Sequence, residues 1–290
     1  MRFEVINSLT KDFTVLQMCE TLIVSRSNYY YWKNNQQSKT AVENNLLAKE
    51  IQAIFDISRK TYGIKRLKAE LEVKKGLRIG HNRIAKIKQS NNIYPKTKRK
   101  HKITTDSNHS NRVSPNLLNR DFYAVRPYEK LVSDITYIST LEGWLYLSTV
   151  IDLHNRKVVG WAMSDTLEAG IITDSIKMAF IGREKPESCI FHSDRGSQYT
   201  SDDVRNLIDD LGLTQSMSRK ANCWDNSVAE SFFKTLKYEG DIKRVFNTRE
   251  QAKLCIFEFI EVFYNRKRRH STLGYLTPYE FELLYLNQIA

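Results

Sequence analysis

The stretch KLVSDITYIST at residues 130–140 decides the fold, because it places Asp134 inside an apolar, β-branched run. Runs of this kind, bounded by turn residues, are typical of β-strands. Two further strand-length runs lie at 143–153 and 156–165, so the pattern predicts three adjacent strands in an antiparallel meander. An unpaired carboxylate in a half-buried strand is costly. A functional role for Asp134 is therefore favoured over a structural one.

The segments after the meander alternate between helix and strand. Apolar residues at helical spacing occupy 167–182 and 201–211, and short apolar runs occupy 189–194 and 213–218. A meander followed by alternating helices and strands predicts an α/β fold, in which a mixed sheet has helices against its faces. We expect this core at 127–240.

Two helices are expected to follow the core, within 241–290. Thr248-x-x-Gln251 and Thr277-Pro278-x-Glu280 both have the pattern of a capping box. In that motif a threonine hydroxyl and a Glu or Gln side chain satisfy backbone N–H groups at the start of a helix. The pattern predicts that these C-terminal helices pack on the core.

The first 104 residues show helical patterns only. In 1–38, apolar residues at helical spacing, a break and a second helix capped by Ser25 predict a small helix-turn-helix shape. Ile23 occupies the turn position where a glycine would be comfortable, so a plain helical hairpin stays open as the alternative. Three amphipathic helices are expected in 40–104, and a linker in 105–126.

Positive charge is concentrated in one segment. Lys and Arg total 45 against 33 Asp and Glu, a formal net charge of +12. Residues 60–104 hold 15 Lys or Arg against Glu70 and Glu72, or +13, which leaves about −1 for the rest of the chain. A block this basic attracts a polyanion, because neutralised phosphates release their counterions. Nucleic acid is the favoured partner, ahead of a solvated basic surface or an anionic membrane.

The segment 40–104 is therefore a candidate DNA-binding module. Its last two helices carry basic residues that we expect to be exposed along a DNA backbone: Lys65, Arg66, Lys68, Arg83, Lys86 and Lys88. Near the C-terminus, Arg268 and His270 in YNRKRRH are weaker candidates for backbone contacts. A structural loop is an equally open reading of that segment.

Cysteine and hydropathy patterns exclude several classes of protein. The cysteines lie far apart with no paired spacing, so the sequence indicates neither a zinc site nor a disulfide framework. No apolar stretch approaches the roughly 20 residues that span a membrane. The N-terminus also lacks the apolar core of a signal peptide. We expect a cytoplasmic protein with no membrane partner.

Asp134, Asp194 and Glu230 form the candidate catalytic and metal-binding set. Carboxylate oxygens are ligands of Mg²⁺, and two such ions about 3.5–4 Å apart clamp the attacking and leaving oxygens of a phosphoryl displacement. Two of the residues have clear structural alternatives. Asp194 precedes a turn, and Glu230 fits a capping box with Ser227.

Neighbouring residues refine this set. Asp152 also ends a strand, but its place before a His-Asn-Arg turn favours a turn role. Asn226, Lys234 and Lys237 lie at i−4, i+4 and i+7 from the glutamate and so share its helix face. Two lysines beside a catalytic carboxylate suit DNA phosphates. These three residues are candidates for DNA contacts, with a solvated helix face as the alternative.

Four motifs in order resemble one protein family. They are SDITYI at 133–138, FHSDRGSQYTS at 191–201, DNSVAESFFKTLK at 225–237 and YNRKRRHSTLGYLTPYEF at 264–281. The core resembles the retroviral-integrase and DDE-transposase superfamily. Nearly the whole chain resembles the second-frame (OrfB) protein of bacterial insertion sequences of the IS-three (IS3) family.

The resemblance implies an RNase H-like core in which Asp134, Asp194 and Glu230 bind two Mg²⁺ or Mn²⁺ ions. It implies that Lys237 corresponds to a basic residue that binds element ends. DNA is the implied substrate, held by a homo-oligomer that brings two ends together. The implied protein partner comes from the upstream frame and carries a helix-turn-helix and a leucine zipper.

The expected function is metal-dependent cleavage of DNA at the ends of an insertion element and strand transfer to target DNA. Such a protein acts in DNA transposition, integration and recombination. Two alternatives stay open. One is a structure-specific nuclease on the same fold, and the other is a DNA-binding regulator or accessory subunit that is active only with the upstream-frame protein.

Overall fold

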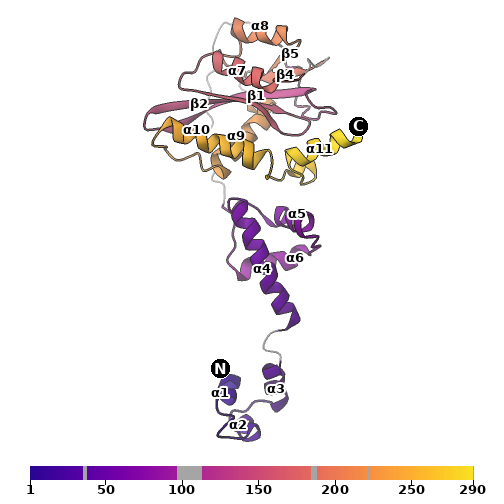
Figure 1. Cartoon of the computed structure of the whole chain (residues 1–290), viewed down its shortest axis with the longest axis vertical. Helices are drawn as coiled ribbons and strands as arrows, with labels where there is room; N and C mark the ends of the chain where they lie inside the picture. Colours follow the sequence, from indigo (N-terminus) through magenta and orange to yellow (C-terminus); the bar gives the residue numbers. More distant parts are fainter. Residues whose placement is uncertain (35–37, 97–112, 184–187, 221, 290) are drawn as a thin grey trace. The chain divides into compact units, whose positions relative to one another are not determined.

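The computed structural model describes residues 1–34, 38–96, 113–183, 188–220 and 222–289 (Figure 1). These residues divide into two compact units. The first unit consists of Met1–Ile57 and Gly63–Tyr94, and the second of Ser58–Tyr62 and Pro95–Ala290. Residues 97–104, the last part of the basic segment 60–104, lie outside the described residues.

The first unit begins with the short helices α1 (Arg2–Ser8), α2 (Val15–Thr21) and α3 (Arg26–Asn34). Thr14 and Gln17 form a capping box that starts α2. The order of α2, turn and α3 is that of the helix-turn-helix shape expected here. Ile23 in the turn has a φ of 51°. A β-branched residue is strained at positive φ, which is why a glycine would be comfortable at this position.

Three longer helices complete the first unit: α4 (Lys39–Ile57), α5 (Ile64–Lys75) and α6 (His81–Ser90). Leu47, Ile51 and Leu67 are among their buried residues, as the amphipathic spacing predicts. The expectation that Lys88 is exposed is wrong. Its side chain is buried with the ammonium 5.9 Å from the centroid of the Phe55 ring, and this burial lowers the pKa of Lys88.

The second unit is built on one mixed sheet. Its strands are β1 (Lys130–Thr140), β2 (Gly143–Asp152), β3 (Val158–Ser164), β4 (Ile190–Ser193) and β5 (Thr214–Met217). The spatial order is β3-β2-β1-β4-β5. β1, β2 and β3 pair antiparallel, which confirms the predicted meander, whereas β4 is parallel to both β1 and β5. The predicted α/β mixed sheet is therefore confirmed.

Helices cover both faces of this sheet (Figure 1). α7 (Gly170–Ala179) and α8 (Asp202–Asp210) lie on one face, and α9 (Ser227–Glu239) and α10 (Arg249–Phe257) on the other. A π-helical segment, Glu258–Tyr264, continues α10, and α11 (Pro278–Ile289) follows. The helices bury one apolar layer on each side of β1.

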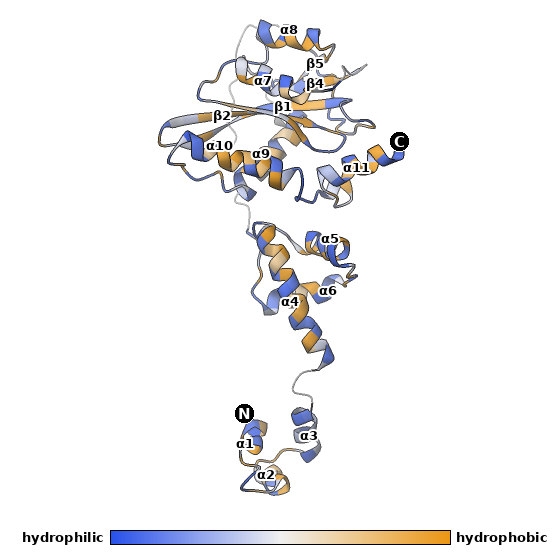
Figure 2. Cartoon of the chain, viewed as in Figure 1, coloured by the Kyte–Doolittle hydropathy of each residue, from blue (hydrophilic) through white to orange (hydrophobic). Residues whose placement is uncertain are grey.

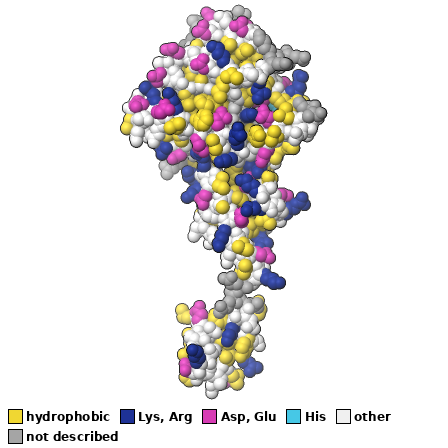
Figure 3. Space-filling view, viewed as in Figure 1, with side chains coloured by type: hydrophobic (Ala, Val, Ile, Leu, Met, Phe, Trp, Pro, Cys, Tyr) yellow, Lys and Arg dark blue, Asp and Glu magenta, His cyan; other side chains and the backbone are white. Residues whose placement is uncertain are grey.

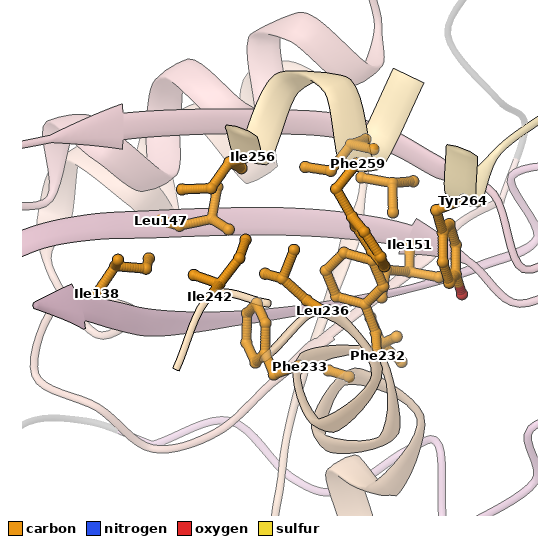
Figure 4. Packing of buried hydrophobic residues seen from close by; sticks show 14 of the residues in the cluster. Ile138, Leu147, Ile151, Phe232, Phe233, Leu236, Ile242, Ile256, Phe259 and Tyr264 are labelled. Atoms are coloured by element: carbon orange, nitrogen blue, oxygen red, sulfur yellow. The ribbon is translucent and has the colours of Figure 1, made fainter. Parts of the chain in front are cut away.

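The larger apolar layer lies between the sheet and α9 and α10 (Figure 4). Leu147 of β2 packs there with Phe232 and Leu236 of α9 and with Phe259. Figure 2 shows the same strands and helices to be rich in hydrophobic residues. On the other face α7 approaches β3 so closely that a Cβ at Gly160 would lie 2.1 Å from the carbonyl oxygen of Ser175. Glycine is required at that crossing.

The predicted caps of the C-terminal helices are present. The Thr248 hydroxyl accepts a hydrogen bond from the Gln251 N–H (3.1 Å) at the start of α10. At α11 the bonds are reciprocal. The Glu280 N–H donates to the Thr277 hydroxyl (3.1 Å) and the Thr277 N–H donates to the Glu280 carboxylate (2.8 Å).

Residues 113–126 pack against the sheet within the second unit. The Met217 N–H donates to the Pro115 carbonyl (3.3 Å), and the Ser216 hydroxyl accepts from the Leu117 N–H (2.9 Å). Leu118 is buried. The expected linker at 105–126 is corrected for this described part. The polar composition of residues 113–126 did not indicate that β5 would supply hydrogen-bond partners for their backbone.

A buried ion pair joins α9 to the segment before α11. The Arg268 guanidinium donates to both oxygens of the Glu239 carboxylate, at 2.7 and 2.9 Å. The two side chains are 7% and 2% exposed. Removing one partner of such a pair leaves an uncompensated buried charge.

Arg268→Met tests this pair. We expect the free energy of unfolding to fall by about 3–5 kcal/mol, because Glu239 loses its partner. The double variant Arg268→Met/Glu239→Leu should recover much of that loss, since both charges are removed. Denaturant titration measures each difference. Lys267→Met, at an exposed position of the same loop, is the control, and an equal loss in the control and in Arg268→Met would contradict a buried-charge role.

Candidate active site

The register of the sheet brings Asp134 and Asp194 together. β1 and β4 run parallel, with Lys130 opposite Ile190 and Val132 opposite His192. Pairing with β4 ends at Val132, two residues before Asp134, and Asp194 directly follows the last residue of β4, so both aspartates lie just beyond the paired segment. Residues that follow a paired segment on adjacent parallel strands lie near one another, because neighbouring strands are about 4.8 Å apart.

The pKa of Asp134 shows that the three predicted carboxylates act on one another. Burial raises this pKa well above its ordinary value, and the charges of Asp194 and, to a smaller extent, Glu230 raise it further. The Ile135 N–H, which donates to the Asp134 carboxylate at 2.8 Å, and the charge of Lys237 both oppose the increase. The negative charge of Asp134 is therefore disfavoured at this position unless a cation offsets it.

Asp194 has the turn role that was its structural alternative. Its Oδ1 accepts a hydrogen bond from the Gly196 N–H at 2.9 Å. A Cβ at Gly196 would lie 3.1 Å from the same oxygen, so the small residue lets the turn close over the carboxylate. The turn fixes one oxygen of Asp194 without removing it from the neighbourhood of Asp134.

Glu230 is not the helix cap that the sequence also allowed. α9 begins at Ser227 after a 3₁₀ turn at Cys223–Asn226, and its first N–H groups receive no side-chain cap. The Glu230 carboxylate instead accepts from the Lys234 ammonium at 3.0 Å. The capping-box alternative is excluded, and Glu230 lies in the first turn of α9, facing a cation.

Asp152 has the turn role expected for it. The side chain is fully buried and accepts hydrogen bonds from the N–H groups of His154 (2.9 Å) and Tyr128 (3.2 Å). Burial raises the pKa of Asp152 to about 6. The residue caps the end of β2 and plays no part in the carboxylate cluster.

Asn226 ties the helix of Glu230 to the strand of Asp134. It is 5% exposed, and its Nδ2 donates to the Ser133 carbonyl at 3.1 Å. Its buried Oδ1 has no hydrogen-bond partner among the described residues. This placement makes Asn226 a positioning residue and not the exposed DNA contact that was expected.

A buried aspartate anchors the turn before α9. Asp225 accepts from the side chain of Arg219 at 2.8 Å through both oxygens, from Arg120 at 2.8 Å and from Asn116 at 2.9 Å. The hydrogen bonds from Arg219 hold the pKa of this carboxyl well below its ordinary value. Sequence reasoning missed this residue, because its partners are distributed over more than a hundred positions.

A neutral histidine supports the end of β4. His192 is fully buried between the hydroxyls of Ser216 (2.8 Å) and Ser218 (3.1 Å). Burial lowers its pKa to about 4. On β1 the Ser133 hydroxyl shares a 2.7 Å hydrogen bond with Tyr199. The strand residues that precede the two aspartates, Ser133 and His192, are thus held by uncharged hydrogen bonds.

The carboxylates fit a hard divalent cation, although they are not gathered around one point. Within the described ranges, no three His, Cys, Asp or Glu side chains converge closely enough to hold one ion. The available donors are all carboxylate oxygens, which suits Mg²⁺ or Mn²⁺ and not zinc. A cation between Asp134 and Asp194 would relieve their repulsion and compete with Lys234 for Glu230.

The basic residues of the first unit that were expected to contact DNA differ in their exposure and in their pairing. Lys65 and Lys86 are exposed, and Arg66 is partly exposed. Arg83 donates to Glu43 and Asn44 at 2.9 and 2.8 Å, so part of its charge is already paired. Figure 3 shows Lys and Arg side chains on the visible face of the α4–α6 part.

The expected backbone contacts of Arg268 and His270 are corrected. Both side chains are buried, Arg268 on Glu239 and His270 against the Tyr264 ring at a centroid distance of 4.9 Å. The structural-loop alternative holds. The basic sequence of this segment did not indicate that Arg268 would be buried in an ion pair with Glu239 of α9.

Three family models match the chain. Two models described as integrase core domain match residues 124–223 and 211–278, and one described as HTH-like domain matches 42–101. The protein "Transposase InsF for insertion sequence IS3A" of Escherichia coli (strain K12) is 38% identical over 287 residues, which cover 97% of this chain and 98% of the relative. The chain belongs to the IS3 family of transposases.

A second relative agrees with this membership. The "Insertion element IS600 uncharacterized 31 kDa protein" of Shigella sonnei is 41% identical over 273 residues, 94% of this chain and 100% of the relative. Among solved structures, a simian T-cell lymphotropic virus intasome chain matches with a TM-score of 0.43, 15% identity and coverages of 74% and 69%. The BIV integrase catalytic core matches with 0.39, 22% identity and coverages of 56% and 97%.

No described helix of this IS3-family chain combines the length and the apolar character needed to cross a membrane.

Asp225→Asn tests the anchor before α9. We expect the free energy of unfolding at neutral pH to fall by about 1.5–3 kcal/mol, because charged hydrogen bonds are lost. The folded-state pKa is lowered, so this stabilisation is present above the unfolded value near 3.9 and is lost as pH falls below it. The difference from the unsubstituted protein should therefore shrink below about pH 4. Asp209→Asn, an exposed acid on α8, is the control, and a difference independent of pH would contradict the assignment.

Proposed function

We propose that this chain catalyses metal-dependent cleavage of DNA at the ends of an insertion element and transfer of the freed strand to target DNA. The observation that carries the proposal is the parallel pairing of β1 with β4, which ends just before Asp134 and Asp194, together with the effect of the Asp194 charge on Asp134. Glu230 on α9 is near enough for its charge to raise the pKa of Asp134. Membership of the IS3 transposases gives this carboxylate cluster its substrate, DNA.

Asp134, Asp194 and Glu230 would hold two Mg²⁺ or Mn²⁺ ions. When bound, such ions activate water or a 3′-hydroxyl for attack and stabilise charge on the leaving oxygen. The chain's own residues prepare for this. Lys234 neutralises Glu230 while no cation is present, and Asn226 fixes the distance between α9 and β1.

Lys237 is suited to hold a DNA phosphate at this cluster. It follows Glu230 by seven residues on α9, and the charge of Asp134 acts on its ammonium. Lysine offers a compact positive charge with three donors. A phosphate placed there would lie beside the carboxylates. No protein nucleophile is needed, because the attacking group comes from water or DNA.

The binding partners of this chain are proposed from its basic residues and its membership of the IS3 family. DNA would bind along the exposed basic residues of α5 and α6 as well as at the core. We also propose a homo-oligomer that holds two element ends, and a helix-turn-helix and leucine-zipper protein from the upstream frame. Both assemblies rest on membership of the IS3 family.

Asp134→Asn tests the catalytic proposal. We expect loss of strand cleavage on DNA that carries the element's own ends, in Mg²⁺ and in Mn²⁺, because one ligand charge is removed where two ions must be held. DNA binding should change little, since the basic surface is intact. Gel-based cleavage and fluorescence-anisotropy binding measure the two properties.

The matched control is Asp209→Asn, which removes a carboxylate of α8 from the exposed surface. It should cleave like the unsubstituted protein. An Asp134→Asn protein that still nicks element-end DNA in magnesium would sink the assignment. Joining to an oligonucleotide with a free 3′-hydroxyl separates a transposase from a structure-specific nuclease.

The basic face of the first unit has its own test. Lys65→Gln/Lys86→Gln should weaken DNA binding and reduce the slope of log affinity against log salt by about 0.9 for each phosphate contact removed. Lys177→Gln/Lys253→Gln removes the same charge from α7 and α10 as the control. If both pairs lower the slope equally, only net charge matters and the proposed face is wrong.

A further inference from the structure

Two large aromatic side chains stand exposed on the sheet of the second unit. Tyr137 of β1 is 54% exposed and Trp144 of β2 is 49% exposed. Their ring centroids lie 5.2 Å apart and the ring planes meet at 79°, an edge-to-face contact. Neither ring belongs to the apolar layers that hold the helices to the sheet.

This aromatic pair lies close to the carboxylates. Tyr137 follows Asp134 by three residues on one strand, a separation of about 10 Å along β1. Pairing of β1 with β4 ends at Val132 and His192, so β4 does not cover the edge of β1 between the aspartate and the tyrosine. Because side chains alternate along a strand, Tyr137 and Asp134 point to opposite faces of β1 at this edge.

Lys237 connects the two features. Its ammonium lies 5.1 Å from the centroid of the Tyr137 ring, a cation–π geometry. The same ammonium is attracted by Asp134, and the charge of Lys243 also acts on it. A cation suited to a phosphate therefore lies between the carboxylates and an exposed ring face.

The hairpin that carries Trp144 is held in place from α10. The Trp144 carbonyl accepts from the Arg249 side chain at 3.2 Å, and the Arg249 N–H donates to the Glu142 carboxylate at 2.7 Å. A Cβ at Gly143 would lie 3.0 Å from the same guanidinium. The aromatic pair is thus presented on a fixed support, which lowers the entropy cost of binding a flat ligand.

We propose that Tyr137 and Trp144 form a stacking subsite for one unpaired nucleobase of the DNA strand whose phosphate is held at Lys237 beside Asp134, a proposal that rests on the proposed function. Aromatic rings accept any base, because every base has a π-face. A paired base inside a duplex does not offer that face. The occupant is therefore a nucleotide flanking the reacting phosphate, with its base turned out of the stack.

This subsite would keep the reacting strand single-stranded beside the carboxylates. A base held on the Tyr137 and Trp144 rings cannot pair again with its complement. The adjoining phosphate then stays on Lys237, within reach of Asp134 and Asp194. The subsite contributes to substrate position, and it is tolerant of base identity because no hydrogen-bonding group of the pair needs to read the base.

Stacking is measured with element-end DNA that has a short single-stranded overhang carrying 2-aminopurine, bound in Ca²⁺ by the full-length Asp134→Asn protein. We expect quenching of 2-aminopurine at one overhang position. In the same background, Tyr137→Ala and Trp144→Ala should each abolish the quenching and weaken binding of the overhang DNA by roughly 5- to 150-fold. Tyr137→Phe should retain both, because the ring remains.

Tyr123→Ala is the matched control, since Tyr123 is an exposed aromatic near Lys130, at the opposite end of β1. It should leave quenching and affinity unchanged. Thermal unfolding of each variant, with Trp144→Phe as a second change at that position, identifies any loss caused by misfolding. Full quenching in folded Tyr137→Ala and Trp144→Ala proteins would overturn the proposal.

Sedimentation separates a second possible occupant. If Tyr137→Ala lowers the oligomeric state and leaves the quenching intact, the aromatic pair is a subunit contact and the stacking proposal fails. Both sedimentation and quenching are measured without cleavage of the DNA. Cleavage by the Asp134→Asn protein would overturn the proposed function while leaving the stacking result standing, and loss of stacking alone would leave the carboxylate site standing.

Discussion

Repulsion between Asp134 and Asp194 is the constraint on which the rest of this site depends. Pairing of β1 with β4 ends just before the two aspartates, and burial raises the pKa of Asp134, so its charge is costly there. Repulsion between two neighbouring aspartates at this position does not contribute to the stability of the fold. A bound divalent cation would supply the missing positive charge, which is the proposed connection between the sheet and phosphoryl-transfer chemistry.

The supporting residues hold the two aspartates and Glu230 in place without neutralising the aspartates. His192 is neutral at the end of β4, and Asn226 joins α9 to β1 by an amide. The charged anchor, Asp225, is paired with arginines outside the cluster. Lys234 and Lys237 bring positive charge to the carboxylates, and both are on the helix that also carries Glu230.

Local sequence patterns predicted the meander and the helices, because alternation and helical spacing are properties of each segment alone. They also identified the three carboxylates, through the strand context of Asp134 and the ordered motifs. They could not show which cations would be buried. Arg268 pairs with Glu239, twenty-nine positions away, and Lys88 lies against Phe55, so both were expected at the surface. Pairing of β4 with β1, which joins the site, is likewise a long-range property.

The most direct test of a shared metal site is anomalous diffraction from crystals of the protein bound to element-end DNA and soaked in Mn²⁺. The account predicts manganese between Asp134 and Asp194, with the Glu230 carboxylate moved from Lys234 onto the metal. Manganese bound elsewhere, or a Glu230 that still pairs with Lys234 at saturating Mn²⁺, would contradict it.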